Sequence, residues 1–304
     1  MSGAVRTVAF IGLGLMGRLM AANLVRAGFE VRSFDLNGSG NCESAKETAK
    51  NAEFLITMLP DGKAVRRAVR AALPGLAPGS IVIDMSSSSP YDTIRLNEIL
   101  RVKKIFLLDA PVSGAKAKAQ DGTLAIMVGG DAAVLKRARP VLSTLGTQIF
   151  HTGKLGSGHA TKALNNYLGA AGTIAGFEAL LVGSEFGLDP KVLVEVINAS
   201  TGKNSTTERK IPQQVFTGAF ASGFQLALMT KDVAIAQAMA RALRMKTPYL
   251  GNTLKIWREA QRKLRAGADH TEMYRYLEGL SRLQRAKPRA ARRAPSPALR
   301  PARR

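Results

Sequence analysis

Cysteine is almost absent from this sequence, and histidine is scarce. Cys42 is the single cysteine among 304 residues. No disulfide can therefore form within the chain, and a reducing compartment fits. His151, His159 and His270 lie far apart in the sequence and form no spacing typical of a metal site, so we predict no metal centre. We interpret His159 as a helix-end hydrogen-bonding residue and the other two as structural or exposed.

Acidic residues are also few. The chain has 22 Asp and Glu against 44 Lys and Arg, a formal net charge of +22. Residues 281–304 contain basic side chains and no acidic ones, and their Pro, Arg and Ala content predicts a disordered basic tail at 284–304. A basic surface attracts anions. No nucleic-acid-binding motif occurs, so we expect a small anionic substrate and no specific nucleic acid partner.

Long apolar runs are missing as well. No stretch approaches the roughly 20 apolar residues that span a membrane, and the first apolar segment, Val8–Ile11, leads directly into a glycine-rich turn. Neither a membrane anchor nor a signal peptide fits this pattern. We therefore expect a cytoplasmic globular protein that is not associated with a membrane.

A glycine-rich turn follows the first predicted strand, at residues 7–11, and precedes a helical run at 18–27. The turn consists of Gly12, Leu13, Gly14, Leu15, Met16 and Gly17. In this G-x-G-x-x-G pattern, the first glycine makes the turn and the second lets the backbone approach a pyrophosphate. The third lets the helix pack on the strand. The pattern predicts dinucleotide binding, and the alternative is a tight turn without a ligand.

The second predicted strand, at 29–34, ends at Asp35. A carboxylate there accepts hydrogen bonds from the adenosine ribose and repels a 2′-phosphate, which favours NAD over NADP. Arg32 and Asn37 leave NADP open. Residues 36–40 are too few for the usual crossover helix, so we predict a sheet truncated at the edge between the second and third strands.

Further strands at 53–59, 80–85, 104–108, 123–130 and 148–150 alternate with helical segments, as in a mostly parallel, doubly wound α/β sheet. We assign residues 1–156 to this Rossmann-type domain. Two of its loops carry hydroxyl groups where strands end: Ser86–Ser89, and 109–115 with Ser113. The second of these can cradle a carboxylate. For the serines of the first, the alternative is helix capping.

The sequence after residue 156 reads as all helical, and we assign 157–283 to a helical C-terminal domain. Its first helix, at about 158–186, is apolar around most of its circumference and connects the two domains. Lys162 and Asn166 are four residues apart and share one face of this helix. They can place a proton donor and an orienting group over one substrate; the alternative is a solvated lysine. The apolar surface predicts a homodimer or homotetramer.

Four motifs in fixed order resemble the β-hydroxyacid dehydrogenase family, of the 3-hydroxyisobutyrate dehydrogenase type, over residues 5–280. They are the glycine-rich turn with Met20-Ala21-Ala22-Asn23-Leu24; the run Asp109-Ala110-Pro111-Val112-Ser113-Gly114; the set Gly156, Gly158, Lys162, Asn165 and Asn166; and Lys231-Asp232-Val233.

The resemblance implies a site residue by residue. It implies that Lys162 is the catalytic residue and Asn166 its substrate-orienting neighbour, and that Ser113 and Gly114 hold the substrate carboxylate. The other implied residues are Leu59, Pro60, Ser87 and Lys231 on the cofactor, Asp232 at the active-site rim and Phe224 in the pocket wall. It implies an NAD(P)-dependent oxidoreductase that interconverts a small 3-hydroxy acid and its semialdehyde.

Two departures from the family pattern stand out. Ala115 replaces a second glycine after Gly114, and the helix after Asp35 is missing. Sibling activities stay open: reduction of tartronate, succinic or sulfonated semialdehydes, or oxidation of a sugar acid. An imine reductase is less consistent with Lys162. A non-catalytic nucleotide-sensing or nucleic-acid-associated scaffold is the remote alternative.

Overall fold

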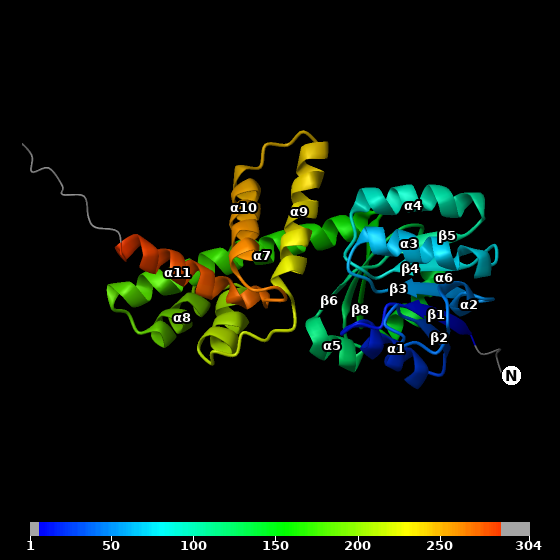
Figure 1. The fold of residues 1–304 in the computed structure, drawn as a ribbon, viewed down its shortest axis with the longest axis horizontal. Coiled ribbons are helices and arrows are strands. Elements are labelled where there is room, and N and C mark those ends of the chain that lie inside the picture. Colours follow the sequence, from blue (N-terminus) through cyan, green and yellow to red (C-terminus); the bar gives the residue numbers. More distant parts are fainter. Residues whose placement is uncertain (1–5, 287–304) are drawn as a thin grey trace, which may run out of the picture.

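The computed structural model describes residues 6–286, which form two parts joined by one long helix (Figure 1). The N-terminal part is a mostly parallel β-sheet with helices on both faces. The C-terminal part is entirely helical. This arrangement matches the Rossmann-type and all-α domains expected from the sequence.

The sheet has eight strands, and its order is β2-β1-β3-β4-β5-β7-β6, with β8 paired to β7. β5 and β6 run antiparallel to β7, and the other pairs are parallel. The strands are β1 (Thr7–Ile11), β2 (Glu30–Phe34), β3 (Phe54–Thr57), β4 (Ile81–Asp84), β5 (Phe106–Asp109), β6 (Val112–Ser113), β7 (Ala125–Gly129) and β8 (Gln148–Gly153).

The strands β1, β3 and β4 are apolar on both sides, so both faces of the sheet must be buried. A different set of helices covers each face. One face packs on α1 (Gly17–Arg26), α5 (Ala115–Asp121) and α6 (Ala132–Ser143). The other packs on α2 (Ala45–Thr48), α3 (Gly62–Ala72) and α4 (Pro90–Val102), beside the short η1 (Leu73–Gly75). The carboxyl ends of β1, β3, β4 and β5 therefore share one edge of the sheet, where ligands of such folds bind.

The β2 edge is truncated, as the sequence predicts. Between Asp35 and β3 the only helix is the four-residue α2, and β2 is the last strand on this side. Asn41 takes the place of a neighbouring strand: its side chain accepts from the Ser33 backbone N–H at 2.6 Å and donates to the Val31 carbonyl oxygen at 3.0 Å. These bonds satisfy edge groups that a missing strand leaves open.

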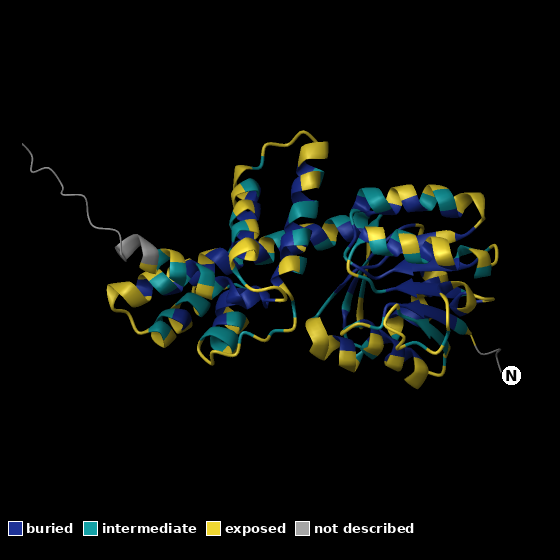
Figure 2. Ribbon diagram, viewed as in Figure 1, coloured by how far each residue is buried: buried dark blue, intermediate teal, exposed yellow. Residues whose placement is uncertain are grey.

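The helical domain is organised around α7 (Ser157–Phe186), which is 30 residues long. The other helices are α8 (Pro190–Asn198), the π-helix η2 (Thr206–Val215), α9 (Leu226–Ala242), α10 (Pro248–Lys263), η3 (His270–Glu272) and α11 (Met273–Ala286). Trp257 and Phe177 are fully buried in the core that these helices form with α7. Figure 2 shows buried residues, in dark blue, along α7 and the helices beside it.

By length and composition α7 qualifies as a possible membrane span, which the sequence analysis did not anticipate. Its packing against α9, α10 and α11 fits the core helix of a folded domain, which passes the same test.

Three local expectations were wrong. Residues 109–115 are not one loop, because Val112–Ser113 pairs with β7 and α5 begins at Ala115. The segment 201–207, whose polar residues predict a loop, is not wholly a loop, because η2 begins at Thr206. The expected tail starts three residues too early, since α11 continues to Ala286. Residues 287–304 lie outside the described part of the chain.

Candidate active site

In the glycine-rich turn after β1, one glycine has room for a side chain and the other two do not. Gly12 has a φ of +102°, and a Cβ there would lie 2.4 Å from the Met58 carbonyl oxygen. A Cβ on Gly17 would lie 1.9 Å from the Gly12 carbonyl oxygen. Nothing lies within 4 Å of the corresponding position on Gly14. The turn therefore packs tightly at its ends and is open in the middle, which fits a pyrophosphate at the N-terminus of α1.

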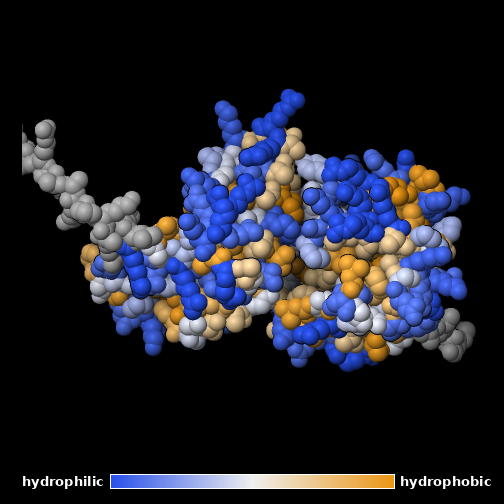
Figure 3. All heavy atoms as spheres, in the orientation of Figure 1, coloured by the Kyte–Doolittle hydropathy of each residue, from blue (hydrophilic) through white to orange (hydrophobic). Residues whose placement is uncertain are grey.

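Leu13, Leu15 and Met16 complete this turn. Leu13 and Met16 pack against the sheet core, and Leu15 is partly exposed. The Leu15 side chain lies 3.7 Å from the position of a Cβ on Gly223, in the loop before α9. The turn therefore approaches the helical domain, and Figure 3 shows a notch in the surface between the two domains.

Asp35 at the end of β2 is tied to the glycine-rich turn. One carboxylate oxygen accepts from the Leu13 backbone N–H at 2.6 Å, and the other accepts from the Asn37 N–H at 3.0 Å. Arg32 does not form a free phosphate clamp, because its guanidinium donates to Glu30 and to the Lys50 carbonyl oxygen. Asp35 is therefore held at the end of β2, and Arg32 is engaged by protein groups.

Lys231 on α9 connects the helical domain to the loops after β3 and β4. Its ammonium donates to the carbonyl oxygens of Pro60, at 2.9 Å, and Ser87. Leu59 is held in the same region by its N–H, which donates to Ser86 Oγ at 2.9 Å. Three predicted cofactor contacts, at 59, 60 and 87, thus lie beside the predicted cofactor lysine.

Lys231 is also connected, through Asp232, to Asn166 of the predicted catalytic pair. It forms an ion pair with Asp232 at 3.2 Å, and Asn166 Nδ2 donates to the second oxygen of Asp232 at 2.6 Å. Asp232 is 1% exposed, so it does not lie at an open rim as the resemblance implied. Its carboxylate instead holds Asn166 and Lys231 in fixed orientations.

Lys162 stands one turn before Asn166 on α7 and is partly buried. Burial lowers the pKa of its ammonium below that of an ordinary lysine. The Asp232 carboxylate opposes this effect, and the Lys231 charge adds to it. No carboxylate of a described residue lies within 4 Å of the ammonium. Lys162 is therefore an amine that loses its proton more easily than a solvated lysine does.

The start of α7 is anchored to the sheet by Asp109, at the end of β5. Its two carboxylate oxygens accept from the backbone N–H groups of Gly156, at 2.7 Å, and His159, at 2.8 Å. The buried His159 ring lies 2.8 Å from Thr93 Oγ1 and 3.1 Å from the Ser86 carbonyl oxygen. The helix-end hydrogen bonding expected of His159 is present, and it fixes α7 one turn before Lys162.

The predicted carboxylate loop and pocket wall lie on opposite domains. Ser113 and Gly114 follow Asp109 by four and five residues and are partly exposed. Phe224 belongs to the helical domain, where its carbonyl oxygen accepts from the His270 N–H at 2.9 Å. Asp269 supports this loop by accepting from the Gly223 N–H at 3.0 Å. The structure gives no direct contact between Ser113 or Phe224 and Lys162.

Two functional features were not found from the sequence. Asp109 was read only as part of a loop motif, although a carboxylate before a helical domain is a possible N-terminal anchor. The helix η2, which carries Lys210, was not predicted either; the sequence indicated only that the polar loop 201–205, with Arg209 and Lys210, can read a second anionic group of a substrate. No group of three or more His, Cys, Asp and Glu side chains suited to a metal occurs in the described residues.

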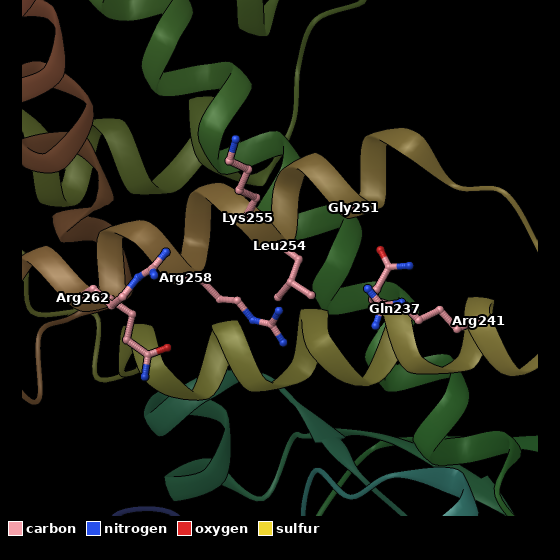
Figure 4. A pocket seen from close by; sticks show the side chains of 8 residues that line it. Gln237, Arg241, Gly251, Leu254, Lys255, Arg258 and Arg262 are labelled. Atoms are coloured by element: carbon pink, nitrogen blue, oxygen red, sulfur yellow. The ribbon is translucent and has the colours of Figure 1, made fainter.

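A groove of about 690 Å³ lies away from these residues, between α9 and α10 (Figure 4). The cations that line it are Arg241, Lys255, Arg258 and Arg262. It contains none of the predicted catalytic or cofactor residues, so it is separate from the site around Lys162.

Comparison with known proteins gives two family matches that together cover most of the chain. Residues 7–153 match the NAD binding domain of 6-phosphogluconate dehydrogenase, and residues 156–277 match the domain described as NAD-binding of NADP-dependent 3-hydroxyisobutyrate dehydrogenase.

The similarity to individual relatives extends over most of this chain and most of each relative. The 3-hydroxyisobutyrate dehydrogenase of Pseudomonas aeruginosa is 39% identical over 79% of this chain and 87% of the relative. The 2-(hydroxymethyl)glutarate dehydrogenase of Eubacterium barkeri is 34% identical over 82% and 87%. The structure of the Mycobacterium tuberculosis 3-hydroxyisobutyrate dehydrogenase with L-serine has a TM-score of 0.83 and 34% identity, covering 90% of this chain and 99% of that one.

Proposed function

We propose that this protein oxidises a small 3-hydroxy acid to its semialdehyde with NAD, and that it catalyses the reverse reduction. The premise is that the chain belongs to the 3-hydroxyisobutyrate dehydrogenase family of NAD(P)-dependent β-hydroxyacid dehydrogenases. The observation that carries the proposal is one chain of contacts. It runs from Pro60 and Ser87 through Lys231 and Asp232 to Asn166, one turn from Lys162.

Bound NAD(P) supplies the hydride acceptor. During oxidation, the neutral amine of Lys162 takes the proton of the substrate hydroxyl as the carbinol C–H bond breaks. In the reverse direction the ammonium stabilises the forming alkoxide and returns the proton. The lowered pKa of Lys162 suits both roles, because a larger fraction of the amine is neutral near neutral pH than for an ordinary lysine. Asn166, held by Asp232, orients the hydroxyl.

The remaining site residues have binding roles in this proposal. Ser113 and the backbone at Gly114 hold the substrate carboxylate, and Phe224 forms the apolar wall. The open side of Gly14 receives the pyrophosphate. Asp35 favours NAD, and the engagement of Arg32 with Glu30 and Lys50 supports this preference.

The reacting end of the substrate is the part of this proposal that is most specific. 3-Hydroxyisobutyrate and 2-(hydroxymethyl)glutarate, the compounds in the names of two relatives, share a primary alcohol next to a carbon that bears a carboxylate. The sibling activities on tartronate, succinic or sulfonated semialdehydes and on sugar acids are the alternatives. They keep the same chemistry at Lys162 and differ in the rest of the pocket.

A panel of these acids and aldehydes, each assayed with NAD(H) and NADP(H), tests the proposal. We expect turnover of at least one 3-hydroxy acid, with a higher kcat/KM for NAD than for NADP. Absence of turnover with every member of the panel and both cofactors would contradict the proposed reaction. Equal use of both cofactors would contradict only the assignment of Asp35.

We further propose a homodimer or homotetramer in a reducing, cytoplasmic setting. The exposed apolar side chains of the distal half of α7 and of α8 support association; they are Val182, Phe186, Leu188, Val192 and Val196. Light scattering coupled to size exclusion measures the oligomeric state, and a monomer at micromolar concentration would contradict this part.

A further inference from the structure

One face of α7 continues beyond the predicted catalytic pair. Lys162, Asn166, Gly169 and Thr173 are spaced by four, three and four residues, so they lie in one line along the helix. Asn166 and Thr173 are two turns apart, about 10 Å along the axis. A molecule that reacts at Lys162 therefore extends along this line if it continues beyond Asn166.

Gly169 leaves open space in the middle of this line. Nothing lies within 4 Å of the position that a Cβ would occupy there. By contrast, Gly176 on the same helix faces the Thr206 side chain at 3.1 Å, so its lack of a side chain serves packing. Glycine inside a helix is less favourable than alanine. No packing contact accounts for Gly169, and the space above it is available to a ligand.

Lys210 on η2 contacts the far end of this line, at Thr173. Its ammonium donates to Thr173 Oγ1 at 2.7 Å and to Thr206 Oγ1 at 3.3 Å. An ammonium has three donors, so one N–H has no partner here. Within residues 6–286 no carboxylate lies within 4 Å of it. Lys210 is a partly buried cation without a carboxylate partner in the described part of the chain.

Burial makes this arrangement unfavourable for the isolated protein. Desolvation, with a smaller contribution from the neighbouring Arg209 charge, lowers the pKa of Lys210 to about 8. The group is still mostly charged at neutral pH. A charge that is partly removed from water is normally paired, because its desolvation is otherwise uncompensated. An anion that reaches the third N–H of Lys210 would supply the missing partner.

We propose that Lys210, which the hydroxyls of Thr173 and Thr206 hold in place, binds a second, terminal carboxylate of a hydroxy dicarboxylic acid, whose carbon chain passes over Gly169. This inference rests on the proposed function, since it assigns the first carboxylate to Ser113 and the reacting hydroxyl to Lys162. It deepens that function by naming the substrate class: 3-hydroxy acids that carry a second anionic end.

Two substrates with the same reacting end test the proposal. In 2-(hydroxymethyl)glutarate a carboxyethyl group replaces the methyl group of 3-hydroxyisobutyrate. The ratio of their kcat/KM values, measured at pH 7 where Lys210 is charged, isolates the contribution of the distal carboxylate. We expect the wild-type protein to favour the dicarboxylate at least tenfold. We expect Lys210→Met to lower the ratio at least tenfold through KM, as for an interaction lost equally from bound substrate and transition state.

Three further variants define the result. Arg209→Met removes an exposed neighbouring cation and should leave the ratio unchanged, whereas Lys210→Arg should restore part of it. Gly169→Leu fills the open space without touching Lys210 and should lower the ratio, which keeps the test valid if Lys210→Met folds poorly.

The outcomes separate this inference from the reaction itself. Oxidation of 3-hydroxyisobutyrate without a preference for the dicarboxylate overturns the role of Lys210 and leaves the proposed function in place. Equal losses for both substrates in Lys210→Met would indicate a structural role and would also overturn it. Failure of the wild-type protein to oxidise either compound or any other hydroxy acid overturns the proposed function, and this inference with it.

Discussion

Six consecutive residues, Gly12–Gly17, form the turn proposed to bind the pyrophosphate, whereas the contacts next to Lys162 join α7 to α9 and to the loops after β3 and β4. In the turn, backbone geometry decides what can bind. Around Lys162, side chains from distant parts of the sequence are brought together, and Asp232 links them to the cofactor loops. The contrast teaches that one half of the site is encoded locally and the other by tertiary packing.

Two glycine substitutions sharpen this contrast within the turn itself. Gly17→Ala places a Cβ against the Gly12 carbonyl oxygen. We expect it to lower the free energy of unfolding by roughly 3 kcal/mol or more, because backbone must move. Gly14→Val points into open space, so we expect a change below about 1 kcal/mol. It should nevertheless weaken NADH binding at least tenfold.

Denaturant unfolding and fluorescence titration with NADH measure the two effects separately. A Gly17→Ala variant as stable as the wild type would contradict the packing role of Gly17. A Gly14→Val variant that binds NADH as the wild type does would contradict the ligand-binding role of Gly14.

Asp269→Ala tests whether the helical side depends on side-chain networks. Asp269 accepts from Ser222, Gly223 and Thr271 and caps η3. Its removal should lower the free energy of unfolding by about 2 kcal/mol. Burial alone would raise the pKa of Asp269, but hydrogen bonds from His270, Thr271 and Ser222 outweigh it and hold the pKa below its ordinary value.

The sign of the pH dependence follows from that lowered pKa. The stabilising contribution is fully present above the ordinary carboxyl pKa of about 3.9 and is lost as the pH falls below it. Urea unfolding at a series of pH values should therefore show the wild type and Asp269→Ala converging in acid. A constant difference down to the lowest pH would contradict the network.

Asp232→Asn tests how the two halves are coupled. The Asp232 carboxylate raises the pKa of Lys162 against the effect of burial, so its neutralisation should lower that pKa further. Oxidation needs the neutral amine and rises with pH through this pKa. The rising limb of kcat against pH should therefore move to lower pH. A limb that stays in place, or moves to higher pH, would argue against Lys162 as the titrating group.

Ala115→Gly is the smallest expected effect. Ala115 has a φ of +56°, in the left-handed region, where the family pattern has glycine. Relief of this strain should stabilise the fold by about 0.5–1 kcal/mol, because glycine adopts the conformation freely but loses more chain entropy. Thermal unfolding measures it, and a destabilised variant would contradict the assignment of strain.

The sequence predicted most of the sheet because buried strands and glycine turns are local signals. Asp35 and the truncated edge could be predicted for the same reason: five residues cannot form a crossover. The sequence could not reveal that Asp109 caps α7 or that Asp232 is buried between Lys231 and Asn166, because these contacts join elements 47 and 66 residues apart. Nor did periodicity reveal η2, because a π-helix is rare and does not follow the 3.6-residue period.

Lys162 is proposed to perform the proton transfer, while residues other than Lys162 bind the cofactor. Lys162→Met tests it most directly, with the exposed Lys154→Met as a matched control. We predict that kcat falls by about 10³-fold or more, while the Kd for NADH changes less than about threefold and Lys154→Met behaves as the wild type does. A Lys162→Met variant whose kcat stays within tenfold of the wild-type value would contradict the account.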